Sequence, residues 1–470
     1  MSLITSVSGI RGTIGGKEGD NLTPPDIVKF TQAYAALLKS KFSEPKRIRV
    51  LVGRDGRISG EAISGLVCAT LNLCGIDVLD TGLSTTPTIE TGVPEKKCQG
   101  GIIITASHNP FNWNALKLLN ENGEFISEED GQRLLELTQK PFLFPDVLKL
   151  GNTTNEEGLI DLHVEKILNL NLVKPDLIQK KKFTIVCDTI NSTGSLALKK
   201  LLQALGVKNI YFINEEINGR FAHNPEPLPE HLNDLSKEVR KRKADLGVAV
   251  DPDVDRLVLV CEDGDFFGEE YTLVAVADYV LSQTGKNKKT VSNLSSTQAL
   301  EEITRKHGGT YYASPVGEVH VVKKMKEVGA VIGGEGNGGV IYPELHYGRD
   351  ALVGLALFLS YLASSGKTVS ELRKTYPNYY ISKNKLELQP SWDSDEVLAR
   401  LHEKYKKRFT CITEDGLKIL LGKEWVHLRK SNTEPIIRIY TESTSQLLSE
   451  NLAKQFIQEV GSIVKELIID

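Results

Sequence analysis

The stretch Gly100–Pro110, GGIIITASHNP, joins a short apolar run directly to small and polar residues. Three branched residues, Ile102–Ile104, form a continuous apolar run that is typical of a strand buried on both faces. Pro110 disfavours helix at Asn109, so the sequence predicts a tight loop that presents Ser107 just beyond the strand. Ligands of open α/β sheets bind beyond the carboxyl ends of strands. We therefore expect a ligand site at Ser107, with an ordinary polar turn as the alternative.

This strand belongs to a strand–helix–glycine–strand plan that occurs three times along the chain. The first copy starts at Ile48, the second at Lys182 and the third at Thr290. Each copy ends in a loop rich in chemical groups, the second in DPDVDR at 251–256 and the third in GGEGNGG at 333–339. Such crossover units build α/β domains with parallel strands. After about residue 377 the pattern changes to short strands and one long helix, which predicts a smaller α+β domain.

The composition excludes several classes of protein. The chain has 470 residues, of which 40% are hydrophobic and 25% charged, so we expect a globular protein of three or four domains. The net charge of −4 includes no lysine-rich block, which argues against a nucleic-acid partner. No apolar run approaches the ~20 residues that span a bilayer, and no signal peptide is evident. The six cysteines form no CxxC pair and the nine histidines no zinc motif, so we expect a cytoplasmic protein without zinc.

The DPDVDR loop places Asp251, Asp253 and Asp255 at alternate positions. In extended backbone their carboxylates would project the same way, and three like charges so close together favour a bound divalent cation. Ligands that are all oxygen atoms favour Mg²⁺ or Mn²⁺. An EF-hand is excluded because Arg256 stands where that loop needs glycine. A solvated turn, or a phosphatase that uses the first aspartate as nucleophile, remains an alternative.

Two further loops carry polar groups that suit a sugar phosphate. Glu335 and Asn337 lie among five glycines, which let the backbone approach a ligand closely while the two side chains bind hydroxyls. The later segment RKSNTEPIIRI concentrates donors of the kind that bind phosphate. These donors are Arg429, Ser431, Asn432, Thr433 and Arg438. A flexible turn is the alternative for the first loop, and a charged hairpin turn for the second.

Two more basic residues are candidates for the same site. Lys117 follows Ser107 by ten residues and would lie beside it if the segment NALKLL returns over the serine loop. Arg11 stands between Ile10 and Gly12 near the start of the chain. A solvated helix lysine and a surface arginine are the alternative interpretations of these two residues.

The motifs TASHNP, DPDVDR, GEGNGG and RKSNTEP, in this order, closely resemble those of the α-D-phosphohexomutases. GIRG near the start and GRDGRISG at 53–60 add to the resemblance, which covers essentially the whole chain. It implies an α/β fold of three similar α/β domains with mixed sheets and a smaller C-terminal α+β domain around a central cleft. We place these domains at residues 1–153, 154–265, 266–376 and 377–470.

The resemblance also implies a mechanism. Ser107 would carry a phosphoryl group and, with the three aspartates, bind one Mg²⁺ per chain. Hexose phosphates would be the small-molecule substrates, and a hexose 1,6-bisphosphate would be the activator of a monomer or homodimer. Ser107, Lys117, Arg256 and Arg11 would be catalytic. Contacts to substrate would come from His108, Glu335, Asn337, Arg429, Ser431, Asn432, Thr433 and Arg438.

The chain departs from the pattern of many bacterial members in the sugar loop. Asn337 replaces a serine and Gly339 a histidine, so the imidazole contact is absent and the general base must be another group. Lys117 is the first candidate and Glu318 a weaker one. The loop is more similar to archaeal-type sequences described as phosphoglucosamine mutases, which we expect here. The alternatives are a phosphomannomutase/phosphoglucomutase, a metal-dependent sugar phosphatase and a sugar-phosphate sensor without activity.

Overall fold

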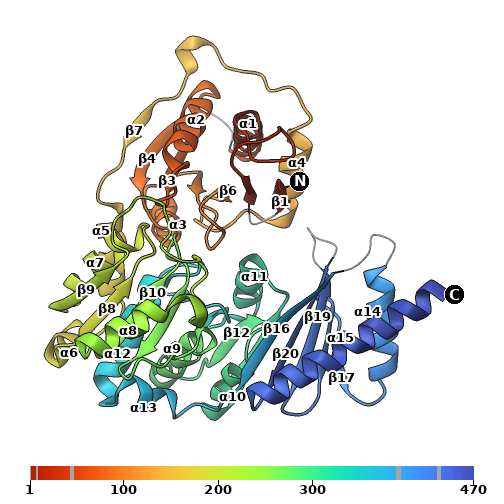
Figure 1. Ribbon diagram of the computed structural model, residues 1–470. Coiled ribbons are helices and arrows are strands. Elements are labelled where there is room, and N and C mark those ends of the chain that lie inside the picture. The colour runs from red at the N-terminus through yellow and green to blue at the C-terminus, as the bar shows by residue number, and fades with distance from the viewer. Residues whose placement is uncertain (1, 7–8, 43–46, 388–392, 431–435, 470) are drawn as a thin grey trace.

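The computed structural model describes residues 2–6, 9–42, 47–387, 393–430 and 436–469. The chain forms four sheets in succession, each with its own helices, and they appear as successive lobes from red to blue in Figure 1. The first three lobes are α/β with mixed sheets and the last is α+β, so the predicted fold class is confirmed. No helix among these residues is long and apolar enough to cross a membrane.

The first lobe contains a seven-stranded sheet. Its strands lie in the order β1 (Ile4–Ser6), β2 (Gly9–Thr13), β6 (Trp113–Leu119), β5 (Gly100–Ile104), β3 (Arg49–Arg54), β4 (Asp77–Leu83) and β7 (Thr153–Asn155). Its helices are α1 (Pro24–Lys41), α2 (Gly60–Leu73), α3 (Thr86–Glu95) and α4 (Glu128–Leu137). All five residues of β5 are buried, as the apolar run predicted.

The second and third lobes each contain a four-stranded sheet. The second has the order β11 (Leu257–Cys261), β10 (Leu246–Val250), β8 (Thr184–Asp188), β9 (Asn209–Ile213), and the third has β13 (Thr310–Ser314), β12 (Lys289–Asn293), β14 (Ile332–Glu335), β15 (Gly339–Ile341). The helices of the second lobe are α5 (Leu159–Leu168), α6 (Pro175–Lys181), α7 (Gly194–Ala204) and α8 (Asn233–Arg242). Those that follow are α9 (Glu269–Gln283), α10 (Ala299–Lys306), α11 (Glu318–Val328), α12 (Ala351–Ser365) and α13 (Val369–Arg373).

The three α/β lobes share one strand plan, and this plan positions the functional loops. In each lobe a central strand pairs in parallel with a strand that then turns back into an antiparallel hairpin. These hairpins are β5–β6, β10–β11 and β14–β15. The serine loop, the aspartate loop and the glycine-rich loop are the turns of these three hairpins. They therefore occupy equivalent places in three repeated units.

The fourth lobe is an antiparallel sheet with two helices. Its strands follow the order β16 (Tyr380–Glu387), β20 (Ile436–Ser443), β19 (Trp425–Lys430), β18 (Leu417–Leu420), β17 (Thr410–Ile412). The helices α14 (Ser394–Tyr405) and α15 (Gln446–Ile469) pack on this sheet, and the side chains of Leu401, Phe456 and Ile439 meet in one core.

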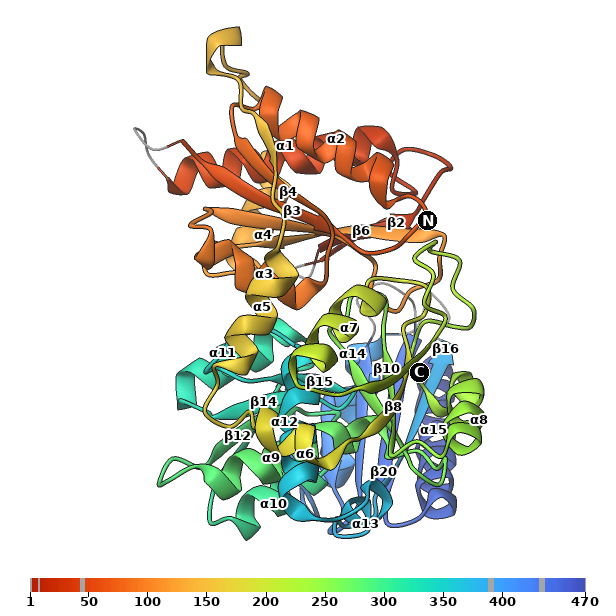
Figure 2. The same ribbon diagram turned by 90° about the vertical axis from the view of Figure 1, so that its left-hand side faces the viewer.

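Helix α12 joins the second and third lobes into one packed body. Its side chains are almost all buried, and it contacts α9 of its own lobe together with α5, α6 and α7 of the second. One hydrophobic core consequently contains residues of both lobes, although each of the two also has a smaller cluster of its own. The first and fourth lobes have their own main cores, and a small cluster that includes Leu51 and Leu159 joins the first lobe to α5. Figure 2 shows α5 directly below α3, where the first lobe meets this central body.

Candidate active site

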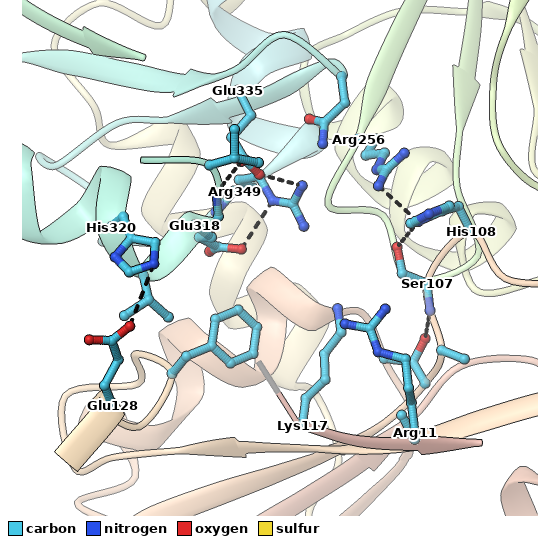
Figure 3. Close-up of a pocket in the computed structure, with 18 residues that line it drawn as sticks. Arg11, Ser107, His108, Lys117, Glu128, Arg256, Glu318, His320, Glu335 and Arg349 are labelled. Atoms are coloured by element: carbon cyan, nitrogen blue, oxygen red, sulfur yellow. Dashed lines mark hydrogen bonds and ion pairs between the residues drawn. The ribbon is translucent and has the colours of Figure 1, made fainter. Parts of the chain in front are cut away.

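The lobes enclose a cleft made of two adjoining cavities. One has a volume of about 390 Å³ and lies between the first and third lobes, and the other, of about 450 Å³, extends to β19 and β20 of the fourth. Both are lined by Arg11, His108, Arg256, Val316, Glu335 and Asn337. Figure 3 shows the side chains around the first cavity. Residues from all four lobes therefore face one central space.

Ser107 lies in a tight turn directly after β5. Its backbone has φ of 48°, in the left-handed region, and its backbone N–H donates to Thr105 Oγ1 at 3.0 Å. The hydroxyl donates to Asp251 Oδ2 at 2.7 Å, so the serine loop meets the aspartate loop. The side chain lines the cleft although the residue is only 7% exposed. The structure thus brings the predicted nucleophile and the predicted metal loop together.

Arg57 holds the serine loop in place, and we did not predict this role from the sequence. Its buried guanidinium donates to the backbone carbonyl oxygens of Ser107, Asn109, Pro110 and Trp113 at 2.5–3.0 Å. Its Nε also donates to Asp55 at 3.0 Å. A planar fork of five donors suits this set of acceptors. The motif GRDGRISG contributed to the family resemblance, but the sequence does not show that Arg57 is buried or which acceptors it contacts.

The aspartate loop is a turn and not the extended segment that we predicted. Val254 adopts φ of 65°, and its N–H donates to the carbonyl oxygen of Asp251 at 3.1 Å. The turn, and not strand alternation, makes the carboxylates of Asp251, Asp253 and Asp255 converge. All three are completely buried, and one oxygen of each lies within 4.8 Å of the others. The correction concerns the backbone only, since the clustering itself is as expected.

The oxygen atoms of this triad fit a metal ion. Two buried carboxylate oxygens, Asp253 Oδ1 and Asp255 Oδ1, have no hydrogen-bond partner among the described residues. Burial, together with the charges of Asp255 and Asp253, raises the pKa of Asp251 well above its usual value. Buried, unpaired carboxylate oxygens are costly unless a cation neutralises them. A donor set made only of oxygens, beside the Ser107 hydroxyl, therefore suits a hard divalent cation.

Lys117 lies in strand β6, not in a helix, and reaches the same triad. It pairs with Ile103 across the hairpin, so the segment NALKLL returns alongside β5, the strand that leads into the serine loop. Its Nζ lies 2.6 Å from Asp253 and 3.4 Å from Asp255. Burial lowers the pKa of this ammonium, but the two carboxylates more than offset burial and raise it overall. Lys117 is thus held as a cation, which disfavours it as a general base in this arrangement.

Further cations gather on the same side of the cleft. Arg256 Nη2 donates to His108 Nδ1 at 2.8 Å, so this nitrogen is an acceptor. Burial and then the charge of Arg256 lower the pKa of His108 well below its usual value. Burial, Arg256 and Arg349 lower the pKa of Arg11, which lines both cavities. Cations that repel one another in a cleft attract an anionic ligand.

The glycine-rich loop presents Glu335 in a fixed orientation. Its Oε1 accepts from Asn293 Nδ2 at 2.8 Å and from the N–H of Gly317 at 3.1 Å. Asn337 Oδ1 accepts from the N–H of Gly339 at 3.2 Å, which closes the turn. Arg349, just before α12, is a second residue that we did not predict. It lines the cleft and contacts three carboxylates from different segments.

The fourth lobe contributes two arginines to the second cavity. Arg429 in β19 and Arg438 in β20 are paired across the sheet, and both line the cavity together with Lys383 and Tyr440. Arg429 Nε lies 2.7 Å from Asp415 Oδ2. The predicted donors Ser431, Asn432 and Thr433 lie outside the described residues. The described part of this loop is therefore its two basic flanks.

A second cluster with metal-ligand residue types lies where the first three lobes meet. It contains His163, His346 and Asp350. Thr88 Oγ1 accepts from Thr85 Oγ1, which leaves its own proton to be donated to His163 Nδ1 at 3.0 Å. His163 Nε2 then donates to Asp350 Oδ2 at 3.0 Å. Both ring nitrogens of His163 are thus satisfied, and we assign no metal to this cluster.

Models of four protein-family domains match the chain in order. Phosphoglucomutase/phosphomannomutase alpha/beta/alpha domains I, II and III match residues 3–142, 161–264 and 268–380. The C-terminal domain of the same family matches residues 387–459. The three predicted boundaries between the domains, at 153/154, 265/266 and 376/377, remain predictions.

Known proteins resemble the chain over its whole length. A phosphoglucomutase/phosphomannomutase of Thermococcus kodakarensis is 36% identical over 97% of this chain and 98% of its own. A probable phosphoglucosamine mutase of Methanopyrus kandleri is 32% identical over 99% of this chain and 100% of its own. The crystal structure of a phosphoglucomutase/phosphomannomutase family protein from Burkholderia thailandensis is 25% identical, covers 98% of both chains and has a TM-score of 0.82. The chain therefore belongs to the phosphoglucomutase/phosphomannomutase family, the α-D-phosphohexomutases, and is an isomerase that transfers a phosphoryl group within its substrate.

Proposed function

We propose that the protein interconverts hexose 6-phosphate and hexose 1-phosphate through a phosphorylated Ser107 and a bisphosphorylated sugar, with glucosamine phosphate as the preferred substrate. The observation that carries this proposal is the 2.7 Å hydrogen bond from Ser107 Oγ to Asp251 at the cationic end of the cleft. It places a nucleophilic hydroxyl beside three buried carboxylates. A module that only bound sugar phosphates would need neither group.

We propose Mg²⁺ as the cation, one per chain, held by Ser107, Asp251, Asp253 and Asp255. The unpaired oxygens of Asp253 and Asp255 support this assignment. When bound, the ion would neutralise charge that develops on the transferring phosphoryl group. The other contributions to catalysis come from side chains of the protein itself.

In the first half-reaction the bond between Ser107 Oγ and phosphorus breaks and a bond from phosphorus to a sugar hydroxyl oxygen forms. The sugar hydroxyl loses a proton, and Ser107 Oγ gains one and becomes a hydroxyl. In the second half-reaction the bond between the other phosphorus of the bisphosphate and its sugar oxygen breaks and a bond from that phosphorus to Ser107 Oγ forms. Ser107 Oγ then loses its proton, and the released sugar oxygen gains one. Lys117, Arg256 and Arg11 supply fixed positive charge around the phosphoryl group in both halves. A hexose 1,6-bisphosphate acts as activator because it can phosphorylate Ser107 directly.

The rest of the cleft binds the part of the substrate that does not react. Arg429 and Arg438, with the predicted donors at 431–433, hold the second phosphate by charge-assisted hydrogen bonds. Glu335 and Asn337 bind sugar hydroxyls, and His108 contributes a contact beside the reacting phosphate. The sugar must be bound in two orientations, which requires a cleft with a phosphate site at each end.

The preferred sugar follows from the similarity to phosphoglucosamine mutases, such as the Methanopyrus kandleri relative at 32% identity. A phosphomannomutase/phosphoglucomutase is the second candidate, because the relative at 36% identity has that name. A panel of glucosamine, glucose, mannose and N-acetylglucosamine phosphates, assayed with the matching bisphosphate, separates the two. A higher kcat/KM for glucose or mannose phosphate than for glucosamine phosphate would overturn the preference.

The central test is the substitution Ser107→Ala. We expect mutase turnover to fall at least about a hundredfold, because the group that accepts the phosphoryl group is gone. Transfer of labelled phosphate from a hexose bisphosphate to the protein should be lost as well. Ser282→Ala, at an exposed position of α9, is the matched control and should behave like wild type.

Near-normal turnover in the Ser107→Ala variant would disprove the role of the serine. Release of inorganic phosphate by the wild-type protein, without any interconversion of the 1- and 6-phosphates, would instead indicate the metal-dependent phosphatase.

A further inference from the structure

Gly339, the first residue of β15, is a glycine for a reason of space and not of backbone conformation. Its φ does not lie in the left-handed region, so other residues could adopt this backbone. A Cβ atom at this position would lie only 2.3 Å from Cδ and 3.0 Å from Cγ of Arg349. The stem of Arg349 therefore fills the volume that any other side chain at position 339 would occupy.

The stem of Arg349 leads to a guanidinium group that joins three segments of the site. Nη2 donates to Asp255 Oδ2 at 2.7 Å in the aspartate loop, and Nη1 donates to Glu335 Oε2 at 3.0 Å in the glycine-rich loop. Nε donates to Glu318 Oε2 at 3.0 Å at the start of α11. Figure 3 shows Arg349 between Glu318 and Glu335 at the wall of the cleft.

These three carboxylates depend on Arg349. Each is more than nine-tenths buried, and like charges repel strongly in a medium of low polarity. Burial lowers the pKa of Arg349, but Asp255, Glu318 and Glu335 more than offset burial and raise it overall, so the guanidinium stays charged. A lysine has a single nitrogen on a flexible stem and cannot bridge three separated carboxylates in a plane.

We propose that Gly339 and Arg349 form one positioning unit that fixes the aspartate loop relative to the glycine-rich loop. The unit rests on the proposed function, in which the first loop holds the metal and the second the sugar. It thereby sets the distance between the transferring phosphoryl group and the sugar hydroxyl. Arg349 acts through Asp255 and Glu335, and an error of about 1 Å in such a distance can cost about a hundredfold in rate.

Two single substitutions test the unit, one at Arg349 and one at Gly339. Arg349→Lys keeps the charge but loses the planar fork, and Gly339→Ala keeps the arginine but pushes its stem aside. We expect both to lower kcat/KM at least about tenfold. We also expect both to raise the Kd for Mg²⁺ of the metal-stripped, dephosphorylated protein at least about threefold in calorimetry, because second-layer contacts orient metal ligands.

Arg373→Lys is the matched control. Arg373 stacks on the ring of Tyr271 and donates to the carbonyl oxygen of Phe267, away from the cleft residues. We expect this variant to keep both kcat/KM and the Mg²⁺ affinity within about twofold of wild type. Circular dichroism of all three variants confirms that they are folded.

A double-mutant cycle measures the coupling between the two residues directly. In the background of Arg349→Ala the added Cβ at position 339 meets no arginine stem. In that background Gly339→Ala should change both kcat/KM and the Mg²⁺ affinity by less than about twofold. In the presence of Arg349 the same substitution should lower kcat/KM at least about tenfold and raise the Kd for Mg²⁺ at least about threefold. If Arg349→Ala does not fold, the single substitutions Gly339→Ala and Arg349→Lys decide the question by themselves.

Two results would overturn the unit while wild type behaves as a Mg²⁺-dependent mutase. One is a Gly339→Ala or Arg349→Lys variant that is indistinguishable from Arg373→Lys in both measurements. The other is a cycle in which the effects of the two residues simply add. A wild-type protein that neither binds Mg²⁺ nor isomerises a hexose phosphate would instead overturn the proposed function itself, so the two failures can be told apart.

Discussion

At the scale of single residues, the site is a balance of buried charges. Three aspartates and the Ser107 residue are buried close together, and Lys117, Arg256 and Arg349 surround them. Removal of one partner from such a group leaves another charge unpaired at a cost of several kcal/mol. Substitutions here should therefore affect metal affinity and turnover together, even when they change only one atom.

The substitution Asp253→Asn tests this balance. It removes a proposed metal ligand and the main partner of Lys117, so we expect the Kd for Mg²⁺ to rise at least about tenfold and turnover to fall in parallel. The measurement is a magnesium titration followed by calorimetry and by activity. Asp263→Asn, at an exposed position beyond β11, is the control. An unchanged titration in the Asp253 variant would contradict the assignment of the triad.

The substitution Arg429→Ala tests the opposite end of the cleft. Because Arg429 is proposed to hold the phosphate that does not react, its loss should raise KM about tenfold or more and leave kcat within a few fold. Arg408→Ala, at an exposed position of the same lobe, should leave both constants unchanged. A variant that loses kcat at constant KM would show that Arg429 acts on the reacting phosphate.

At the scale of secondary-structure elements, three hairpins of the same type each present one functional loop. The turns of β5–β6, β10–β11 and β14–β15 contain, respectively, Ser107, the three aspartates, and Glu335, which we propose to bind the sugar. Each turn follows a strand that is buried on both faces and therefore held firmly. A rigid strand that leads into a short turn restricts the movement of the functional residues on that turn and so keeps the distances between them nearly constant.

Arg57 shows how one such turn is held. Arg57→Lys should leave several buried carbonyl oxygens without a donor, at about 1–3 kcal/mol for each. We expect a lower Tm and a loss of phosphoryl transfer to Ser107 of at least about tenfold. The exposed pair of Arg133 with Glu136 on α4 offers the control Arg133→Lys. If the Arg57 variant retains full phosphorylation of Ser107, the turn does not need this support.

The elements were predictable where the pattern is local. The buried strand before Ser107 and the three repeated units both follow from short-range patterns in the sequence. The aspartate turn was predicted wrongly because a valine with positive φ is rare, so no residue pattern pointed to a left-handed Val254. Arg57 and Arg349 were missed for a different reason. Arg349 lies 94 positions from Asp255, and only the folded chain brings such residues together.

At the scale of the whole molecule, the junctions between lobes contain buried polar contacts. Between the third and fourth lobes, His427 Nδ1 accepts from Ser295 Oγ at 2.9 Å, and Nε2 donates to the carbonyl oxygen of Asp415 at 2.7 Å. Burial lowers the pKa of His427 to about 4, although the bond to Asp415 opposes the shift. A protonated ring could not accept from Ser295, so this junction requires the neutral imidazole.

This junction gives the protein a predicted sensitivity to acid. Between pH 6.5 and 4 the unfolded chain protonates His427 while the folded chain does not, so the stability falls as the pH falls, by up to about 3 kcal/mol. His427→Gln can make both hydrogen bonds without titrating. As the pH falls, the Tm of the wild type should therefore decrease more than the Tm of the His427→Gln variant. His402→Gln is the control and should follow the wild type at every pH. If the Tm of His427→Gln also falls with pH in parallel with the wild type, the prediction is wrong.

The buried helix α12 has a consequence for how the enzyme opens. Since α12 packs on both middle lobes, we expect the aspartate loop and the glycine-rich loop to move together when the cleft opens. We therefore expect the proposed substrate to enter, reorient and leave through movements of the first and fourth lobes, which contain Ser107 and the pair of Arg429 and Arg438. The geometry of the site and the binding and release of the substrate would then depend on different parts of the chain.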